Sequence, residues 1–144
     1  MSSILESSVF LPDEAATLSA AADWAKRVRA PLSVALHGDL GAGKTTFVRG
    51  VLRSLGVQGA IKSPTYALVE SYDTAIGEVH HMDAYRIEGR ADFESRGGLE
   101  YFDGPSVRLV EWPEKLDGIV RFDIHIFLSY DGEGRRMRIV EGSV

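Results

Sequence analysis

Apolar residues recur at the spacing of an α-helix directly after Pro12. Asp13 comes just before this run, and its carboxylate can accept a hydrogen bond from a free amide of the first turn. We therefore predict a helix that begins at this point and buries one face. The recurring apolar residues are Leu18, Ala21, Ala25 and Val28.

A short apolar run over residues 31–36 ends at a glycine-rich loop and predicts a buried strand. A second helix is expected from Thr45, because Phe47, Val51 and Leu55 fall on one face. Gly56 follows this face and is a typical C-terminal stop. The chain thus predicts the order strand, glycine loop, helix.

The remaining chain predicts short strands, one broken helix and a final hairpin. Strand-like stretches cover 66–72, 78–85 and 107–110, and a helix over 91–101 is interrupted at Gly97-Gly98. Residues 122–128 and 137–139 alternate in polarity around a turn at 131–134, which is typical of an antiparallel hairpin. We expect one α/β domain over 1–144. Its predicted form is a P-loop NTPase-like three-layer sandwich with a mixed, mainly parallel sheet.

Composition narrows the classes of function. The chain has 144 residues, no cysteine and a formal net charge of −5. Disulfides, thiolate catalysis and cysteine-bound zinc are excluded, and a domain that grips nucleic acid by itself is usually basic. The start lacks a signal-peptide pattern, and no apolar run approaches the ~20 residues that span a bilayer. We expect a cytoplasmic protein with no membrane contact and with a protein or small-molecule partner.

The loop before the second helix carries the strongest chemical signal. Residues 38–45 read Gly-Asp-Leu-Gly-Ala-Gly-Lys-Thr and fit the phosphate-loop pattern G-x-x-x-x-G-K-[ST]. Glycines let successive N–H groups turn toward phosphate oxygens, and the helix N-terminus adds partial positive charge. Lys44 is expected to reach the β- and γ-phosphates, and the Thr45 hydroxyl to bind magnesium. The alternative is an ordinary glycine turn before a helix. The predicted nucleotide contacts in this loop are Asp39, Leu40, Gly41, Ala42, Gly43, Lys44, Thr45 and Thr46.

Hydrolysis needs further groups, and two acids follow strand-like stretches. Glu111 ends the run 107–110, and Asp83 follows the strand-like residues near His80-His81. Either acid can fix magnesium or position a water molecule, and either can be a plain turn carboxylate. Neighbouring residues on a strand face opposite sides, so the two histidines are poorly placed to share one metal ion. We expect one of them to face the core.

Five segments together resemble the TsaE (YjeE) family of bacterial ATPases. The combination S-P-T-[FY], D-x-Y-R and V-E-W is more discriminating than the phosphate loop, which many families share. The segments are Leu11-Pro12-Asp13-Glu14, Gly38 to Phe47, Lys62 to Tyr66, His81 to Arg86, and Leu109 to Pro113.

The resemblance implies roles for individual residues. Thr45 and Glu111 are the expected magnesium ligands, and Asp83 is an expected catalytic or water-positioning acid. Glu111 and Lys44 complete the expected catalytic set. Glu14 and Arg135 fall where the family contacts nucleotide outside the phosphate loop. The remaining functional positions that it implies are Ser63 and Thr65 in a switch-like loop, and Trp112 beside Glu111.

The resemblance also implies a partner and a process. The family supports synthesis of the tRNA base threonylcarbamoyladenosine, and its ATP hydrolysis is thought to reset the TsaB–TsaD complex between turnovers. We therefore expect a weak, partner-dependent ATPase with ATP or ADP and Mg²⁺ as cofactors, which meets tRNA indirectly. Arg86 is a candidate arginine finger. A small-molecule kinase and a switch that binds nucleotide without hydrolysing it stay open as alternatives.

Overall fold

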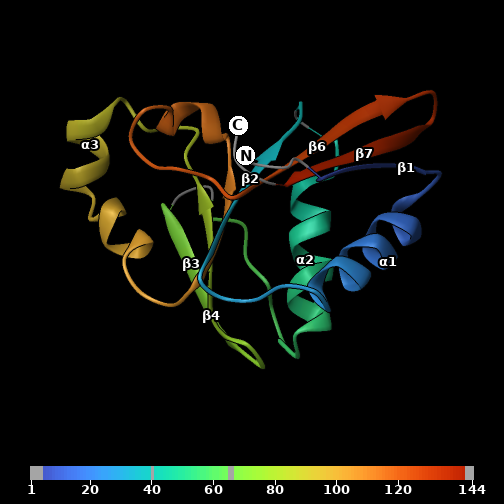
Figure 1. Ribbon diagram of the computed structural model, residues 1–144, viewed down its shortest axis with the longest axis horizontal. Helices are drawn as coiled ribbons and strands as arrows, with labels where there is room; N and C mark the ends of the chain where they lie inside the picture. The colour runs from blue at the N-terminus through green and yellow to red at the C-terminus, as the bar shows by residue number, and fades with distance from the viewer. Residues whose placement is uncertain (1–4, 40, 65–66, 142–144) are drawn as a thin grey trace.

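Seven strands form one sheet in the computed structural model, which describes residues 5–39, 41–64 and 67–141. Three α-helices and two 3₁₀-helices connect these strands (Figure 1). The elements in chain order are β1 Leu5–Leu11, α1 Glu14–Ala25, β2 Leu32–His37, α2 Lys44–Ser54, β3 Val69–Thr74, β4 Gly77–Asp83, α3 Arg90–Ser95, η1 Gly98–Phe102, β5 Val107–Glu111, η2 Pro113–Leu116, β6 Ile124–Asp131 and β7 Gly134–Glu141.

The strand order is β1-β7-β6-β2-β5-β4-β3, with β2 in the centre. Parallel pairs join β2 to β5, β2 to β6 and β4 to β5. Antiparallel pairs join β1 to β7, β3 to β4 and β6 to β7. The mixed α/β sheet and the C-terminal hairpin are confirmed. The described pairs divide equally, however, so the predicted parallel majority is absent from this part of the chain.

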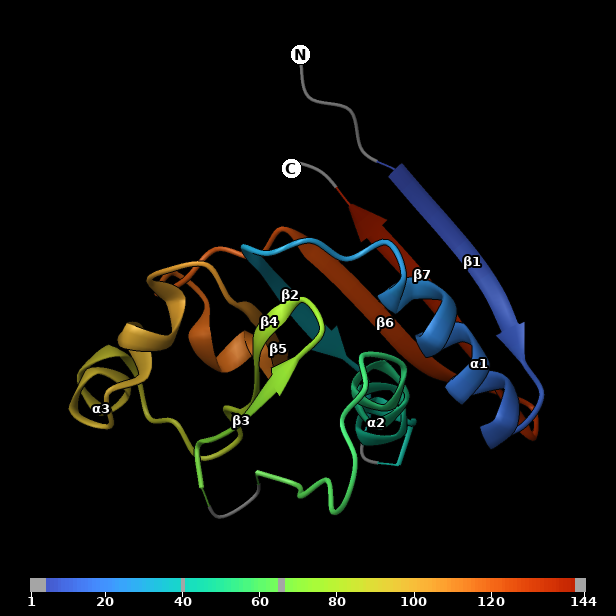
Figure 2. The ribbon, with the colours of Figure 1, turned by 90° about the horizontal axis from the view of Figure 1, so that it is seen from below.

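Strand β1 was not predicted, and it accounts for one of the antiparallel pairs. It lies at the edge of the sheet beside β7 (Figure 2). Its sequence lacks a clear alternation, since Ser7 and Ser8 are adjacent and the apolar Val9 and Phe10 are 43% and 45% exposed. Leu11 is buried. Edge pairing through the backbone, which needs no particular side chains, thus decides the conformation of this segment.

The hydrophobic core has two parts, one on each side of the sheet. Successive residues of β5 separate them, because Leu109 joins one cluster and Val110 the other. The first cluster includes Trp24 of α1 and Phe47 of α2. The second includes Phe93 of α3. Helical segments therefore pack on both faces, with α1 and α2 side by side (Figures 1 and 2). The finer assignment to a P-loop NTPase-like sandwich stays a prediction.

The two predicted long helices are confirmed together with their end signals. The Asp13 side chain accepts a 2.8 Å hydrogen bond from Ala16 N at the start of α1. Helix α2 ends before Gly56, whose φ of 93° is one that glycine adopts without strain. The amides of Gly56 and Val57 then bond the carbonyls of Arg53 and Leu52, a Schellman arrangement that satisfies the last turn. The end of α2 is thereby fixed, and its N-terminal end lies at the site described next.

No helix in the described part of the chain is long and apolar enough to cross a bilayer.

Candidate nucleotide and metal site

The phosphate-loop sequence connects the end of β2, at His37, to the start of α2, at Lys44. Gly41 and Gly43 have φ angles of 80° and 107°, and a Cβ at Gly41 would lie 2.7 Å from the hydroxyl of Tyr130. The turn therefore requires glycine for its backbone conformation, and a side chain at Gly41 would in addition displace the exposed Tyr130 hydroxyl. The predicted order of strand, loop and helix is confirmed.

Lys44 is held at the mouth of the loop. Its ammonium Nζ donates a 2.6 Å hydrogen bond to the Gly38 carbonyl and lies 3.9 Å from the centre of the Trp112 ring. The residue is 5% exposed. Its charge is thus positioned by a carbonyl and an aromatic face, and among the described residues no carboxylate forms an ion pair with it. Such an ammonium can attract a phosphate oxygen.

The two predicted acids lie side by side at the carboxyl ends of parallel strands. Asp83 ends β4, Glu111 ends β5, and the two residues are direct partners in the sheet register. The Thr45 hydroxyl donates to the Glu111 carboxylate, at 3.4 Å from Oε1 and 3.3 Å from Oε2. Asp83 and Glu111, which are 28 positions apart in the chain, are brought together because carboxyl ends of parallel strands meet at one edge.

Thr45 and Glu111 fit a magnesium ion. Mg²⁺ prefers oxygen ligands at about 2.0–2.1 Å in octahedral geometry, which separates neighbouring ligand oxygens by about 2.9 Å. The observed separations of 3.3 and 3.4 Å are within a small side-chain adjustment of that value. Both oxygens are of the chemical type that this ion binds.

The environment of Asp83 raises the pKa of its carboxyl above the ordinary value. Burial raises the pKa of Asp83, the hydrogen bond from the Tyr85 amide opposes the rise, and the neighbouring Glu111 carboxylate adds to it. A carboxylate with a raised pKa is a better proton acceptor at neutral pH than an ordinary one. Asp83 is therefore suited to take a proton from a water molecule at this edge.

A cavity of 320 Å³ joins these groups. Every described residue that lines it belongs to the set predicted from the sequence. Ser63 is among them, whereas Thr65 and Leu40 lie outside the described residues. Arg86 is exposed, and its role as an arginine finger stays a prediction. The lining residues are Gly41, Gly43, Lys44, Thr45, Thr46, Ser63, Asp83, Glu111 and Trp112.

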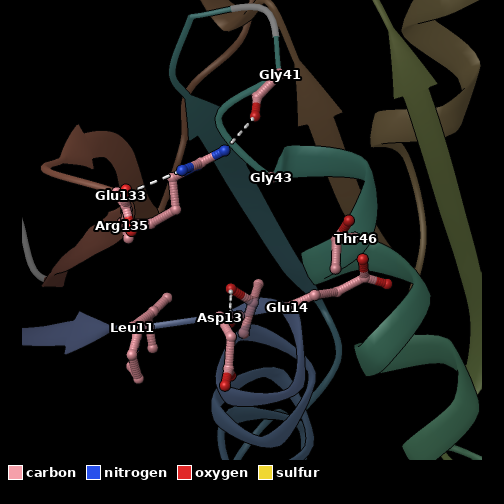
Figure 3. Close-up of a pocket in the computed structure, with 11 residues that line it drawn as sticks. Leu11, Asp13, Glu14, Gly41, Gly43, Thr46, Glu133 and Arg135 are labelled. Carbon is pink, nitrogen blue, oxygen red and sulfur yellow. Dashed lines mark hydrogen bonds between the residues drawn. The ribbon is translucent and has the colours of Figure 1, made fainter.

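A second cavity, of 250 Å³, lies on the other side of the loop and shares Gly41, Gly43 and Thr46 with the first. Glu14 and Arg135 both line it, from α1 and β7 (Figure 3). The Arg135 Nη2 donates a 3.3 Å hydrogen bond to the Gly41 carbonyl. The structure therefore brings the two outlying predicted residues to the phosphate loop.

Glu14 and Arg135 are each held by a neighbour. Glu14 forms a 3.1 Å ion pair with Arg49 of α2, and the Arg135 guanidinium stacks 4.2 Å from the centre of the Tyr130 ring. Asp39 and Ala42 do not appear among the described lining residues of either cavity; their backbones join in a 3.0 Å bond from the Ala42 amide to the Asp39 carbonyl.

His81 belongs to the site and was not predicted as part of it. Its side chain is fully buried, and its Nε2 lies 2.5 Å from Glu111 Oε2. His80 faces the opposite side and contacts Ser71 Oγ at 2.7 Å. Both histidines are buried, where one was expected. The strand period of two, which places His81 on the same face as Asp83, is the sequence signal that points to it.

The fold and the site define a mixed-sheet α/β protein with a phosphate-loop sequence between its central strand and a helix. The family model described as "Threonylcarbamoyl adenosine biosynthesis protein TsaE" matches residues 11–139. The chain belongs to the TsaE family.

Individual relatives agree with this membership. The chain is 38% identical over 137 residues to the TsaE protein of Haemophilus influenzae, covering 91% of this chain and 87% of that protein. It is 36% identical over 136 residues to the protein of the same name from Aquifex aeolicus, covering 91% and 93%. A crystal structure of YdiB from Bacillus subtilis superposes with a TM-score of 0.74 at 27% identity, covering 98% of this chain and 87% of YdiB. Both named relatives are tRNA threonylcarbamoyladenosine biosynthesis proteins.

Proposed function

We propose that this protein binds ATP with Mg²⁺ and hydrolyses it slowly in support of tRNA threonylcarbamoyladenosine synthesis. The observation that carries the proposal is the contact between Thr45 and Glu111 in a cavity that also contains Lys44 and Asp83. Phosphoryl transfer to water uses groups of these kinds at a helix N-terminus: a hydroxyl, two carboxylates and an ammonium.

Each group has a distinct task in this proposal. The loop amides and Lys44 hold the phosphates, and Thr45 and Glu111 hold the ion. Asp83 accepts the proton of the attacking water. Bound Mg²⁺ supplies charge neutralisation to the phosphate oxygens. The cavity beside Glu14 and Arg135 receives the nucleoside, because it continues from the loop on the side away from Glu111.

The partner complex that we propose is TsaB–TsaD, whose cycle the hydrolysis resets. Names of the relatives place them in this biosynthesis, which supports the proposal for this chain. Hydrolysis in isolation is expected to be weak, since positioning by a partner contributes much of the rate in this class of reaction.

Calorimetry with Mg·ATP and Mg·ADP tests the binding step. Wild-type protein should give measurable heat, and Lys44→Ala should weaken binding by about 10- to 100-fold, the size of a lost charge-assisted contact. Lys26→Ala is the matched control, because Lys26 lies exposed just after the end of α1 and pairs with Asp23 at 3.8 Å. No heat from well-folded wild type, with or without its complex, would overturn the proposal.

Phosphate release with purified TsaB and TsaD tests the catalytic step. Asp83→Asn and Glu111→Gln should lower the rate by about 100-fold or more while both variants still bind nucleotide. Binding without any phosphate release would identify a switch instead. Radiolabelled phosphate found on an added acceptor, and not in solution, would identify a kinase.

A further inference from the structure

His81 is a polar side chain buried on β4 between the core residue Val79 and the site residue Asp83, which share its strand face. It is fully buried, and its side-chain hydrogen bond within the described residues is the 2.5 Å contact of Nε2 with Glu111 Oε2. Burial of an imidazole is costly unless a hydrogen bond compensates for the lost water. The contact with Glu111 is therefore the reason that a histidine is tolerated there.

The second ring nitrogen decides which way this hydrogen bond runs. Among the described residues, His81 Nδ1 is the buried side-chain polar atom without a hydrogen-bond partner. A proton on Nδ1 would leave a buried donor unsatisfied and would set a bare Nε2 against a carboxylate oxygen. A proton on Nε2 leaves only an unused acceptor, which costs less. His81 thus donates from Nε2 to Glu111.

This bond restricts the Glu111 carboxylate. Oε2 accepts from His81, and the Thr45 hydroxyl lies 3.3–3.4 Å from both oxygens. The carboxylate is held between a donor on β4 and a donor on α2, in the orientation that faces Thr45. Without His81, one oxygen would lose its fixed partner, and the side chain would be free to turn from the ion.

We propose that His81 is a positioning residue, whose Nε2–H fixes the Glu111 carboxylate so that Glu111 and Thr45 together receive the divalent cation of a bound nucleotide. The inference rests on the proposed function of these two residues as cation ligands. Partners that orient metal ligands in this way typically contribute 10- to 100-fold to metal affinity.

A matched pair of variants isolates the donor. His81→Gln keeps an N–H on a side chain of nearly the same length as Met, whereas His81→Met removes the donor and suits an apolar site. His80→Met is the neighbouring control, because His80 contacts Ser71 on the opposite face and stacks edge-on against Tyr101. His81→Phe keeps a flat ring without the donor and replaces His81→Met if that variant is not folded.

The measurement is ADP affinity by calorimetry, once with Mg²⁺ and once with EDTA, together with thermal unfolding of each variant. Wild type should bind ADP more tightly with Mg²⁺ than in EDTA, and the ratio of the two affinities is called the gain. In His81→Met this gain should be smaller by about 10-fold or more, while the ADP affinity in EDTA stays the same. His81→Gln and His80→Met should retain most of the gain. In a Glu111→Gln background, His81→Met should have no further effect on the gain.

The possible outcomes distinguish a failure of this inference from a failure of the proposed cation binding by Thr45 and Glu111. If the ADP affinity of wild type did not depend on Mg²⁺, the assignment of Thr45 and Glu111 as cation ligands would be wrong, and the inference about His81 would be wrong with it. A folded His81→Met or His81→Phe protein with the full wild-type gain would overturn the role of His81 alone. A further loss in the Glu111→Gln background would show that His81 acts by another route.

Discussion

Trp112 has a backbone conformation that is unusual for its residue type. Its φ of 58° and ψ of 50° are left-handed, and no other non-glycine residue in the described ranges has a positive φ. For an L-residue this conformation costs roughly 1–2 kcal/mol. The ring lies between Lys44, at 3.9 Å, and Tyr85, with ring centres 5.1 Å apart. Because strain of this kind persists only where contacts enforce it, Trp112 is a candidate for a functional role.

The position of Trp112 predicts a fluorescence signal for nucleotide binding. The chain has two tryptophans, and Trp24 is buried against Phe47 in the core, with ring centres 5.6 Å apart. Mg·ADP should change the emission of wild type, because phosphate oxygens beside Lys44 alter the surroundings of Trp112. Trp24→Phe should keep this change and Trp112→Phe should abolish it. The reverse result would place the ligand away from Lys44.

The residues of the site differ in how far the sequence predicts them. The phosphate loop is contiguous, so its pattern alone indicates Gly41, Gly43, Lys44 and Thr45. The strand period places His81 on the same face as Asp83, but its role was missed because only the register between β4 and β5 brings that face to Glu111. Side chains that act across strands require knowledge of that register, and no local pattern contains it.

At the scale of elements, α1 and α2 approach closely at Gly50. A Cβ added there would lie 2.7 Å from Ala21 Cβ and 3.1 Å from the Leu18 carbonyl oxygen. Neither is the far end of a flexible side chain, so the two helices would have to move apart. The glycine is therefore required by packing between helices, and its low helix propensity is tolerated for that reason.

Gly50→Ala should accordingly destabilise the protein although alanine is the better helix former. Helix propensity favours alanine by about 1 kcal/mol, whereas overpacking costs about 1–3 kcal/mol. We expect a net loss in the free energy of unfolding in urea. Adding Ala21→Gly should recover part of the loss, since it removes the closest atom. A Gly50→Ala protein as stable as wild type would show that the helices can separate freely.

A pair of histidines links β2 to β6 on the other side of the sheet from Gly50. His37 Nε2 and His125 Nδ1 are 2.8 Å apart. Burial lowers the pKa of His37, His125 lowers it further, and Glu114 and Asp117 oppose this. Burial also lowers the pKa of His125, with Asp117 opposing. One ring must donate and the other accept, so the pair is stable when it is not fully protonated.

These shifts predict a loss of stability in mild acid. Below the ordinary pKa of 6.5 the unfolded chain takes up protons that the folded chain resists, so the free energy of unfolding falls as pH decreases. Urea unfolding at about pH 7.5 and about pH 5.5 should show this loss, and His125→Asn should reduce it. An unchanged difference in His125→Asn would mean that other groups cause the acid sensitivity.

Elements with local signals were predicted, and those without were not. The cap at Asp13, the stop at Gly56 and the alternation in β6 are each contained in a few neighbouring residues. Strand β1 has no such signal, because its conformation comes from pairing with β7 at the other end of the chain. That long-range pair also shifts the sheet away from the expected parallel majority.

At the scale of the molecule, the site is assembled from segments that are distant in sequence. One cavity is lined by three separate segments, residues 11–17, the loop at 41–46 and residues 133–135. Asp83 and Glu111 line the other cavity, together with residues of the same loop. Strand β1 and the β6–β7 hairpin thus have a second structural role besides completing the sheet. They carry the start of α1 and Arg135 to the phosphate loop, so nucleotide binding should couple both ends of the chain.

Hydrogen–deuterium exchange tests this coupling. A ligand that binds only the folded site lowers local opening wherever it makes contact. Saturating Mg·ADP should slow amide exchange in the loop at 41–46 and also in 12–17 and 133–135, with little change near Glu78 and Glu100, which line a separate cavity. At an ADP concentration that just saturates wild type, Lys44→Ala should lower the protection in all three segments together. Protection at 41–46 alone would mean that the nucleoside leaves the loop in another direction, and that Glu14 and Arg135 serve the fold without touching the nucleotide.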